Sequence, residues 1–282
     1  MNVTLPEKEK INKKRISIYM ISIILCVLAL IAIIIVQILG SDVLDSMVGI
    51  NKLVKRTDKE EENLKANFES ILLNEIKGTA NCSIQKEKNN EDIIYTCYEK
   101  NDKNENYEID VNLPYINIKN SKVQNFNKEI NNTFKVKAEE ILKSKDTNSM
   151  YIVKYEANIE NDILSIIIYS NLKQNTNAQR SIVQTFTYNL AENKEMNLED
   201  VINMYGLNKN DVQAEIKEEV KQEQKKADDL RSLGYNVFSR DLESNIYKIN
   251  NITEFFVYNN NIYIVFAYGN EGLTSEMDLV II

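Results

Sequence analysis

Histidine is absent from this sequence of 282 residues. Zinc-dependent hydrolases build their metal sites largely from histidine, and Ser–His or Cys–His nucleophile pairs need it as their base. These mechanisms are therefore excluded. The paired carboxylates of a glycoside hydrolase could be drawn from 42 acidic residues, but none of these stands in a recognisable motif. We expect no enzymatic activity and no cofactor.

A short segment has the spacing of oxygen ligands that begins a calcium loop. Asp102, Asn104 and Asn106 occupy alternate positions. An EF-hand loop then needs a glycine directly after the third of these residues and a bidentate glutamate at its end. Tyr107 and Leu113 occupy those two positions. We therefore interpret the segment as a solvated turn and expect no metal site.

Glycine and proline are scarce, with seven and two residues in the whole chain. Such a composition leaves no room for a long flexible linker. Hydrophobic residues make up 43% of the sequence and include 15 Tyr and 8 Phe, which is enough apolar material for a core of domain size. We therefore expect most of the chain to be folded.

Basic residues are outnumbered, with 34 Lys and Arg against 42 Asp and Glu. Beyond residue 15 the numbers are 29 and 40, so this part carries a net charge of −11. An acidic surface disfavours nucleic acid and anionic envelope polymers and suits a cationic partner. The alternative that the acidity only keeps the protein soluble stays open.

Charged residues are absent from residues 16–39, a run of 24 positions. As a helix the run would be about 36 Å long, enough to cross a hydrocarbon core of about 30 Å. It does not end in a small-x-small cleavage motif, so we expect the helix to be retained. Asp42 and Asp45 follow it, whereas five basic residues precede it: Lys8, Lys10, Lys13, Lys14 and Arg15. We therefore expect a single-pass cell-membrane protein, with residues 1–15 cytoplasmic and residues 40–282 extracellular.

Residues 40–77 carry an apolar stripe at helical spacing. The stripe consists of Val43, Met47, Ile50 and Val54, and later Leu64, Phe68 and Ile71. This pattern predicts a helical stalk that ends at Gly78. The stripe can serve dimerisation or packing on the protein's own domain, and we favour packing because a helix at a domain surface needs the same stripe.

Residues 78–106 contain two cysteines, Cys82 and Cys97. Apolar residues alternate on both sides of Asn89 and Asn90, which indicates a hairpin. A two-residue turn at these asparagines places Cys82 opposite Cys97. An oxidising exterior permits a disulfide there, although two reduced thiols remain an alternative.

Residues 107–282 predict strands with helices inserted in blocks. Strands are expected at 107–118, at 151–159 and 163–169 around a turn at 160–162, and at 182–188. Ser121 and Gln124 form a capping box for a helix that buries Val123, Phe126, Ile130 and Ile141. Further helices are expected from Asn197, from Asn208 and at 240–249, followed by a hairpin around 259–261 and a last strand at 277–282. The consecutive strands suggest an antiparallel meander, and the fold class is α+β.

The segments ILSI at 163–166, FTYNL at 186–190 and KEMNLEDV at 194–201 resemble a known family. So do EFFV at 254–257, YIVF at 263–266, Tyr268 and VII at 280–282. The family is the extracytoplasmic lysozyme-binding domain of sigma-V-type anti-sigma factors, also found in membrane-anchored peptidoglycan deacetylases. The similarity extends over residues 107–282, and we expect no deacetylase domain.

The resemblance implies that two loops face lysozyme. The first is residues 173–180, with Thr176, Asn177 and Gln179 as expected contacts. The second is residues 267–274, with Tyr268, Asn270 and Leu273. In the first loop the family has a Gly-Gly-Ala-His-Gly-like sequence that this chain lacks, and in the second, Gly272 and Leu273 stand in place of a Pro-Tyr pair. The alternative for Tyr268 is an aromatic residue packed at a strand end.

The resemblance also implies the function. We expect an extracellular protein that captures and inhibits lysozyme and so contributes to lysozyme resistance, with lysozyme and the membrane as partners and no nucleic acid. The alternative is a lysozyme-sensing anti-sigma factor, which needs a cytoplasmic domain that binds a sigma factor. Residues 1–15 are long enough for one short helix only. A receptor for a cell-wall fragment is a third possibility.

Overall fold

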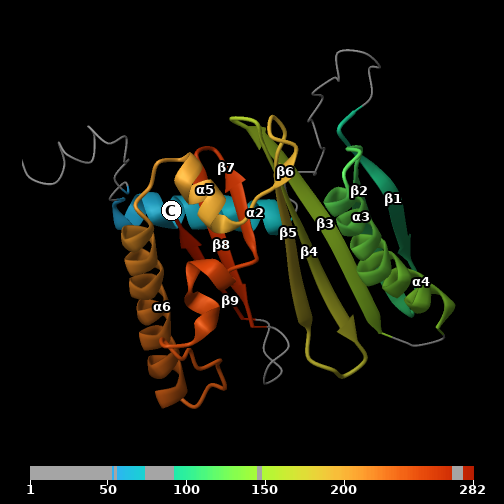
Figure 1. Cartoon of the computed structure of the whole chain (residues 1–282). Coiled ribbons are helices and arrows are strands. Elements are labelled where there is room, and N and C mark those ends of the chain that lie inside the picture. Colours follow the sequence, from blue (N-terminus) through green and yellow to red (C-terminus); the bar gives the residue numbers. More distant parts are fainter. Residues whose placement is uncertain (1–52, 54–55, 74–91, 145–147, 269–275) are drawn as a thin grey trace, which may run out of the picture. The chain divides into compact units, whose positions relative to one another are not determined.

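The computed structural model describes residues 53, 56–73, 92–144, 148–268 and 276–282 (Figure 1). The chain divides into two units, residues 1–52 and Leu53–Ile282, and every described residue belongs to the second. The predicted cytoplasmic segment 1–15 and membrane helix 16–39 lie outside the described residues. Within the described ranges no helix is both long and apolar enough to cross a membrane.

The larger sheet has six strands in the order β1-β2-β3-β4-β5-β6. Its members are β1 (Ile94–Lys103), β2 (Tyr107–Ile116), β3 (Ser149–Glu160), β4 (Ile163–Gln174), β5 (Arg180–Asn189) and β6 (Lys194–Glu195). All neighbours are antiparallel except β2 and β3, which are parallel. The α+β class is therefore confirmed, but the meander is interrupted. A helical crossover joins β2 to β3, because parallel neighbours need a long connection.

This crossover consists of α3 (Ser121–Ile130), the π-helical turn Asn131–Lys135 and α4 (Val136–Lys143). It covers one face of the larger sheet, and the four residues expected on its buried side, Val123, Phe126, Ile130 and Ile141, all lie in this core. The helix cap differs from the expected capping box. Asn120 is the N-cap, and its side chain accepts a hydrogen bond from the amide of Lys122.

The second sheet has three antiparallel strands, β7 (Phe255–Tyr258), β8 (Asn261–Ala267) and β9 (Met277–Ile281). One of its faces packs with α5 (Leu198–Met204) and α6 (Lys209–Ser232) in a common core. Asn197 and Asn208 cap these helices, as the sequence predicts. The helix expected at 240–249 is instead two short 3-10 turns, Asn245–Tyr247 and Ile249–Asn251.

Asparagine sets the geometry of the hairpin turns. The β3–β4 turn has positive φ at Asn161 and Asp162, and the β7–β8 turn has positive φ at Asn259 and Asn260. Two consecutive left-handed residues form the turn whose twist matches antiparallel strands, and Asn and Asp tolerate that conformation better than other non-glycine residues. The chain can therefore form tight hairpins although it contains few glycines.

Helix α2 (Asp58–Leu73) connects both sheets. Its Phe68, Ile71 and Leu72 are buried with residues of β4, β5 and the three-stranded sheet. Before it, Arg56 donates hydrogen bonds to the carbonyl of Ile281 at 3.0 Å and to the Oδ1 atom of Asn261 at 2.8 Å. For these residues the favoured alternative of the stalk prediction, packing on the protein's own domain, is confirmed.

Strand β1 shows the second half of the segment that was predicted as a hairpin at residues 78–106. Residues 94–103 pair with β2 and belong to the larger sheet. The other arm of the predicted hairpin, before Asn89, lies outside the described residues, so that pairing stays a prediction. The register shifts between Thr96 and Tyr98, so Cys97 lies in a bulge, where its Sγ atom is 3.5 Å from the carbonyl oxygen of Pro114. The thiol of Cys97 is free in this structure. Because Cys82 lies outside the described residues, the disulfide between the two cysteines stays a prediction, with two reduced thiols as its alternative.

Candidate functional site

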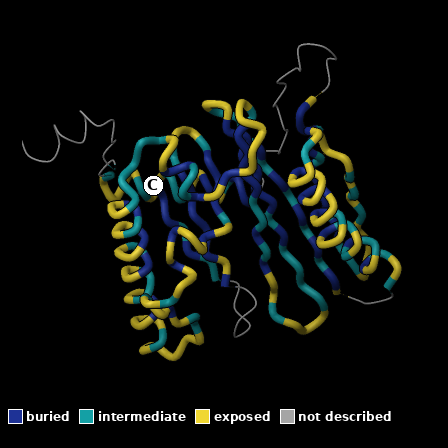
Figure 2. The backbone as a smooth tube through the Cα atoms, viewed as in Figure 1, coloured by how far each residue is buried: buried dark blue, intermediate teal, exposed yellow. Residues whose placement is uncertain are grey.

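The first expected ligand-facing segment forms the turn between β4 and β5. Thr176, Asn177 and Gln179 are all exposed, and Figure 2 shows this turn as an exposed tip. Asn175 has a positive φ of 52°, and its amide donates to the carbonyl of Asn148 at 3.1 Å. These contacts hold the backbone while three polar side chains face solvent.

Hydrogen bonds at the strand ends order the same turn. The amide of Asn177 donates to the carbonyl of Gln174 at 3.0 Å, and the Nε2 atom of Gln179 donates to Asn171 Oδ1 at 3.0 Å. The latter oxygen also accepts from the hydroxyl of Ser181 at 2.7 Å. The turn is therefore a structured surface that a partner could contact without ordering it first.

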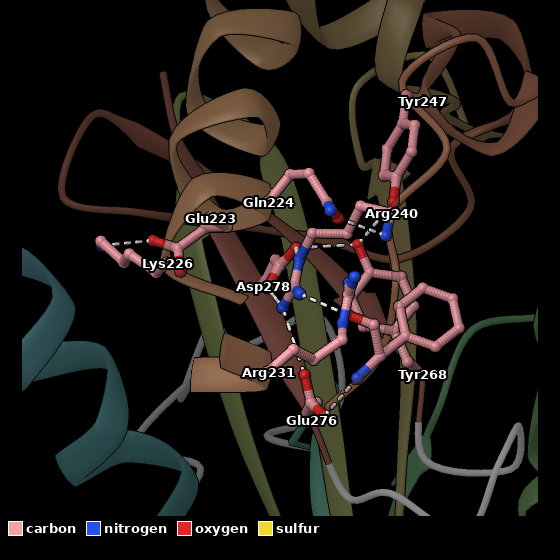
Figure 3. Close-up of polar contacts among 10 residues, drawn as sticks. Glu223, Gln224, Lys226, Arg231, Arg240, Tyr247, Tyr268, Glu276 and Asp278 are labelled. Atoms are coloured by element: carbon pink, nitrogen blue, oxygen red, sulfur yellow. Dashed lines mark hydrogen bonds and ion pairs between the residues drawn. The ribbon is translucent and has the colours of Figure 1, made fainter. Parts of the chain in front are cut away.

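The second expected segment begins at Tyr268, which lies in the core. Its side chain is part of the Tyr268 cluster, which we define as Phe238, Arg240, Tyr247, Tyr268 and Asp278. Figure 3 labels all of these residues except Phe238. The ring of Tyr268 stacks on that of Phe238 at 4.1 Å between centroids, and only 6% of the residue is exposed. Its hydroxyl donates to the Oδ2 atom of Asp278 at 2.8 Å and lies 2.9 Å from the hydroxyl of Tyr247.

A buried ion pair holds this cluster together. The Nε and Nη2 atoms of Arg240 donate to the two carboxylate oxygens of Asp278, both at 2.6 Å. Neither residue is more than 8% exposed. Burial, followed by the charge of Asp278, raises the pKa of Tyr268 far above its ordinary value, so its hydroxyl keeps its proton and remains a donor.

Arg240 also joins distant parts of the chain. Its amide donates to Gln224 Oε1 of α6 at 2.6 Å, and its Nη1 atom donates to the carbonyl of Phe238 at 3.0 Å. Its Nη2 atom also donates a longer hydrogen bond, of 3.4 Å, to the Oε2 atom of Glu276, which lies just before β9. The cluster therefore fixes the segment between α6 and β7 against the last strand, which is a structural role.

These positions separate the residues that the resemblance grouped together. Thr176, Asn177 and Gln179 are exposed on the larger sheet, whereas Tyr268 is buried at the end of β8. The alternative interpretation of Tyr268, an aromatic residue packed at a strand end, agrees with this burial. The remaining two expected contacts, Asn270 and Leu273, lie outside the described residues.

The described residues contain no cluster of side chains that could ligate a metal ion. No group of three or more Cys, Asp or Glu side chains in these ranges is placed to hold a metal ion. Asn104 occupies the hairpin between β1 and β2, where its Oδ1 atom accepts hydrogen bonds from the amides of Asn106 at 2.7 Å and Tyr107 at 3.0 Å. The segment that resembles a calcium loop thus uses its asparagine to stabilise the turn.

Arg240 and Asp278 were not predicted from the sequence as a structural pair. One signal was available, because Asp278 interrupts the otherwise apolar last strand and a carboxylate inside a strand needs a partner. The identity of that partner was not accessible, since Arg240 lies 38 positions away in a polar segment without a motif.

No protein-family model matches the sequence, and no curated protein sequence is similar to it. Solved structures with a distant likeness to this chain include two DUF3298 family proteins. A DUF3298 family protein from Pseudomonas aeruginosa PAO1 has 11% identity and a TM-score of 0.39, over 66% of this chain and 85% of its own. A DUF3298 family member from Bacteroides fragilis NCTC 9343 has 10% identity and a TM-score of 0.35, over 62% and 80%.

Proposed function

We propose that this chain is a membrane-anchored extracellular protein that captures lysozyme and inhibits it. The observation that carries the proposal is the β4–β5 turn, which presents Thr176, Asn177 and Gln179 to solvent on an ordered backbone. A loop of this kind can enter a substrate cleft at little cost in conformational entropy. The resemblance of residues 107–282 to lysozyme-binding domains supplies the identity of the partner.

Charge supports the same partner. Lysozyme is a cationic enzyme, and the chain beyond residue 15 has a net charge of −11. Complementary charge speeds the encounter of two proteins and gives an affinity that falls as salt rises. Catalysis by lysozyme depends on two carboxylates in its cleft, so a loop that occupies the cleft blocks the enzyme.

A direct binding measurement tests this proposal. The full chain, purified in detergent, is immobilised and titrated with lysozyme at several salt concentrations. We expect saturable binding that weakens with salt, together with loss of lysozyme activity at stoichiometric amounts. Absence of binding at low salt would remove the proposed function.

The anti-sigma alternative is a second proposal with its own test. It requires a cytoplasmic region that binds a sigma factor, and residues 1–15 are the segment of this sequence that we expect on the cytoplasmic side. A two-hybrid assay of this segment against extracytoplasmic-function sigma factors is expected to be negative. Robust binding would place the anti-sigma function first.

A further inference from the structure

A cleft of about 430 Å³ lies where α3, β5 and the segment before β7 meet, away from the β4–β5 turn. We name it the acidic cleft. Its volume falls in the range of sites that hold a small ligand or several side chains of a partner. Three phenylalanines, Phe126, Phe186 and Phe255, form its floor, and its walls include Lys122, Glu129, Thr185, Glu195 and Glu254.

The floor of the acidic cleft is apolar but offers no open aromatic face. Phe126, Phe186 and Phe255 are 5%, 6% and 3% exposed, and the first two stack on each other at 4.6 Å. Saccharide sites usually present a whole ring face on which a sugar can lie, since stacking needs contact area. The floor therefore favours a ligand that is bound through the walls.

The walls carry an excess of negative charge. They include three carboxylates, those of Glu129, Glu195 and Glu254, and one ammonium group, that of Lys122. Lys122 pairs with Glu195 at 3.4 Å. Within the described part of the chain, neither Glu129 nor Glu254 forms an ion pair, so two carboxylates in the cleft are not neutralised by a cation.

Glu254 has a structural role that accounts for part of its environment. Its Oε2 atom accepts a hydrogen bond from the amide of Thr185 at 2.6 Å. This amide lies on the open edge of β5, because β6 pairs only with Tyr188 and Asn189. The carboxylate thus caps an edge strand. Burial raises the pKa of Glu254 above its ordinary value, so the charged form is poorly solvated there, and a cation that enters the cleft would relieve this cost.

We infer that the acidic cleft receives a basic side chain, the guanidinium of an arginine or the ammonium of a lysine, presented by a bound protein. Carboxylates on two walls match the several donors of such a cation, and charge-assisted hydrogen bonds are the stronger class of hydrogen bond. The inference rests on the proposed function, because lysozyme is a cationic protein. It adds a second contact region to the β4–β5 turn, on a different part of the larger sheet.

Charge-neutral substitutions test the acidic cleft. Glu254→Gln keeps an oxygen that can accept from the Thr185 amide, and Glu129→Gln changes an exposed helical position. In the full chain in detergent, we expect the double variant to bind lysozyme about tenfold or more weakly. Lys122→Gln should strengthen binding about twofold, because it leaves Glu195 without its cation. The matched control is Glu243→Gln, an acid whose side chain is 85% exposed outside the cleft, and it should change the affinity less than twofold.

Two further measurements make each outcome decisive. Melting temperatures of the variants within about 2 °C of the unmodified chain confirm that the fold is kept, and Glu129→Gln alone serves as the test if Glu254→Gln unfolds. N-acetyl-arginine amide should compete with lysozyme for the unmodified chain, and N-acetyl-glutamine amide should not. Unchanged lysozyme binding by the double variant would overturn the inference that the acidic cleft receives a basic side chain, and the proposed function would stand. Absence of binding by the unmodified chain would overturn both the inference and the proposed function. Binding of triacetylchitotriose in the cleft instead of the arginine probe would overturn the inference in favour of a saccharide.

Discussion

The β4–β5 turn and the Tyr268 cluster treat polar side chains in opposite ways. In the turn, backbone and amide hydrogen bonds fix the chain, and Thr176 and Asn177 remain exposed to water. In the Tyr268 cluster, water is excluded, and the guanidinium, the carboxylate and the phenol satisfy one another. A polar group at low dielectric is costly when it lacks a partner, so each member of the cluster depends on the others.

This difference determines what each region can contribute to recognition. A partner can contact the turn by replacing water, which leaves the internal hydrogen bonds intact. Contact with the Tyr268 hydroxyl would first require its bond to Asp278 to break inside the core. We therefore expect substitutions in the turn to affect binding and substitutions in the cluster to affect stability.

The largest expected effect comes from breaking the buried ion pair. Arg240→Ala leaves the Asp278 carboxylate buried without its cation, which costs about 4 kcal/mol of unfolding free energy. Urea unfolding of the full chain in detergent measures this change. The matched control is Lys217→Ala, whose exposed pair with Glu243 at 3.7 Å is expected to contribute no more than about 0.5 kcal/mol. If both variants lost a similar free energy of unfolding, the buried Arg240–Asp278 pair would contribute no more to stability than the exposed Lys217–Glu243 pair.

Tyr268→Phe is expected to have a smaller effect on stability. The ring and its stacking on Phe238 remain, but the hydrogen bond to the Asp278 carboxylate is lost. This loss should lower the free energy of unfolding by about 2 kcal/mol. Lysozyme affinity should stay within twofold of the unmodified chain. A large loss of affinity at unchanged stability would instead make Tyr268 a contact residue and break the distinction between the two regions.

Glu156 of β3 is half-buried, so it is neither exposed like the β4–β5 turn nor buried like the Tyr268 cluster. It lies opposite Ile167 of β4, which belongs to the same core as Phe68. Burial raises its pKa from 4.5 to about 7. The folded state therefore holds a proton that the unfolded state releases, and stability falls as pH rises from about 4.5 through 7. Glu156→Gln should remove this loss and gain about 1 kcal/mol at pH 8, after allowance for its partial solvent contact. Urea unfolding at pH 4.5 and pH 8 measures the gain, and equal gains at both pH values would contradict this assignment.

Local features of the fold were predictable from the sequence. Asn161 and Asn259 predicted tight turns, and Asn208 predicted the start of a helix. The spacing of Val123 and Ile130 predicted the buried side of α3. Each of these features depends on residues within one turn of helix or one hairpin. Residue spacing and the residue types found in turns can be recognised in a sequence without knowledge of the fold.

Features that depend on distant partners were not predictable. The parallel pairing of β2 and β3 cannot be inferred from alternation, because the same alternation serves either direction. The burial of Tyr268 depends on Arg240 and Asp278, and the motif that matched at Tyr268 contains neither. The exposure of Thr176 was easier to anticipate, since a polar run between two strands lies at the surface.

The smallest expected effect on stability belongs to the turn, and it is the sharpest test of the comparison. Thr176 is exposed at the tip of the β4–β5 hairpin, so Thr176→Trp should change the free energy of unfolding by no more than about 0.5 kcal/mol. If the turn enters the lysozyme cleft, the bulky indole should weaken binding about tenfold or more, because a tight interface does not accommodate added volume. Titration of lysozyme against the full chain in detergent measures this effect. Thr253→Trp, at an exposed threonine that lines the acidic cleft, leaves the turn untouched and probes the second contact region. The control is Gln222→Trp, at an exposed neutral residue of α6 outside the turn and the cleft, and it should leave binding unchanged. Loss of binding in the Thr253 variant alone would move the contact from the turn to the cleft, and unchanged binding in both would remove both sites.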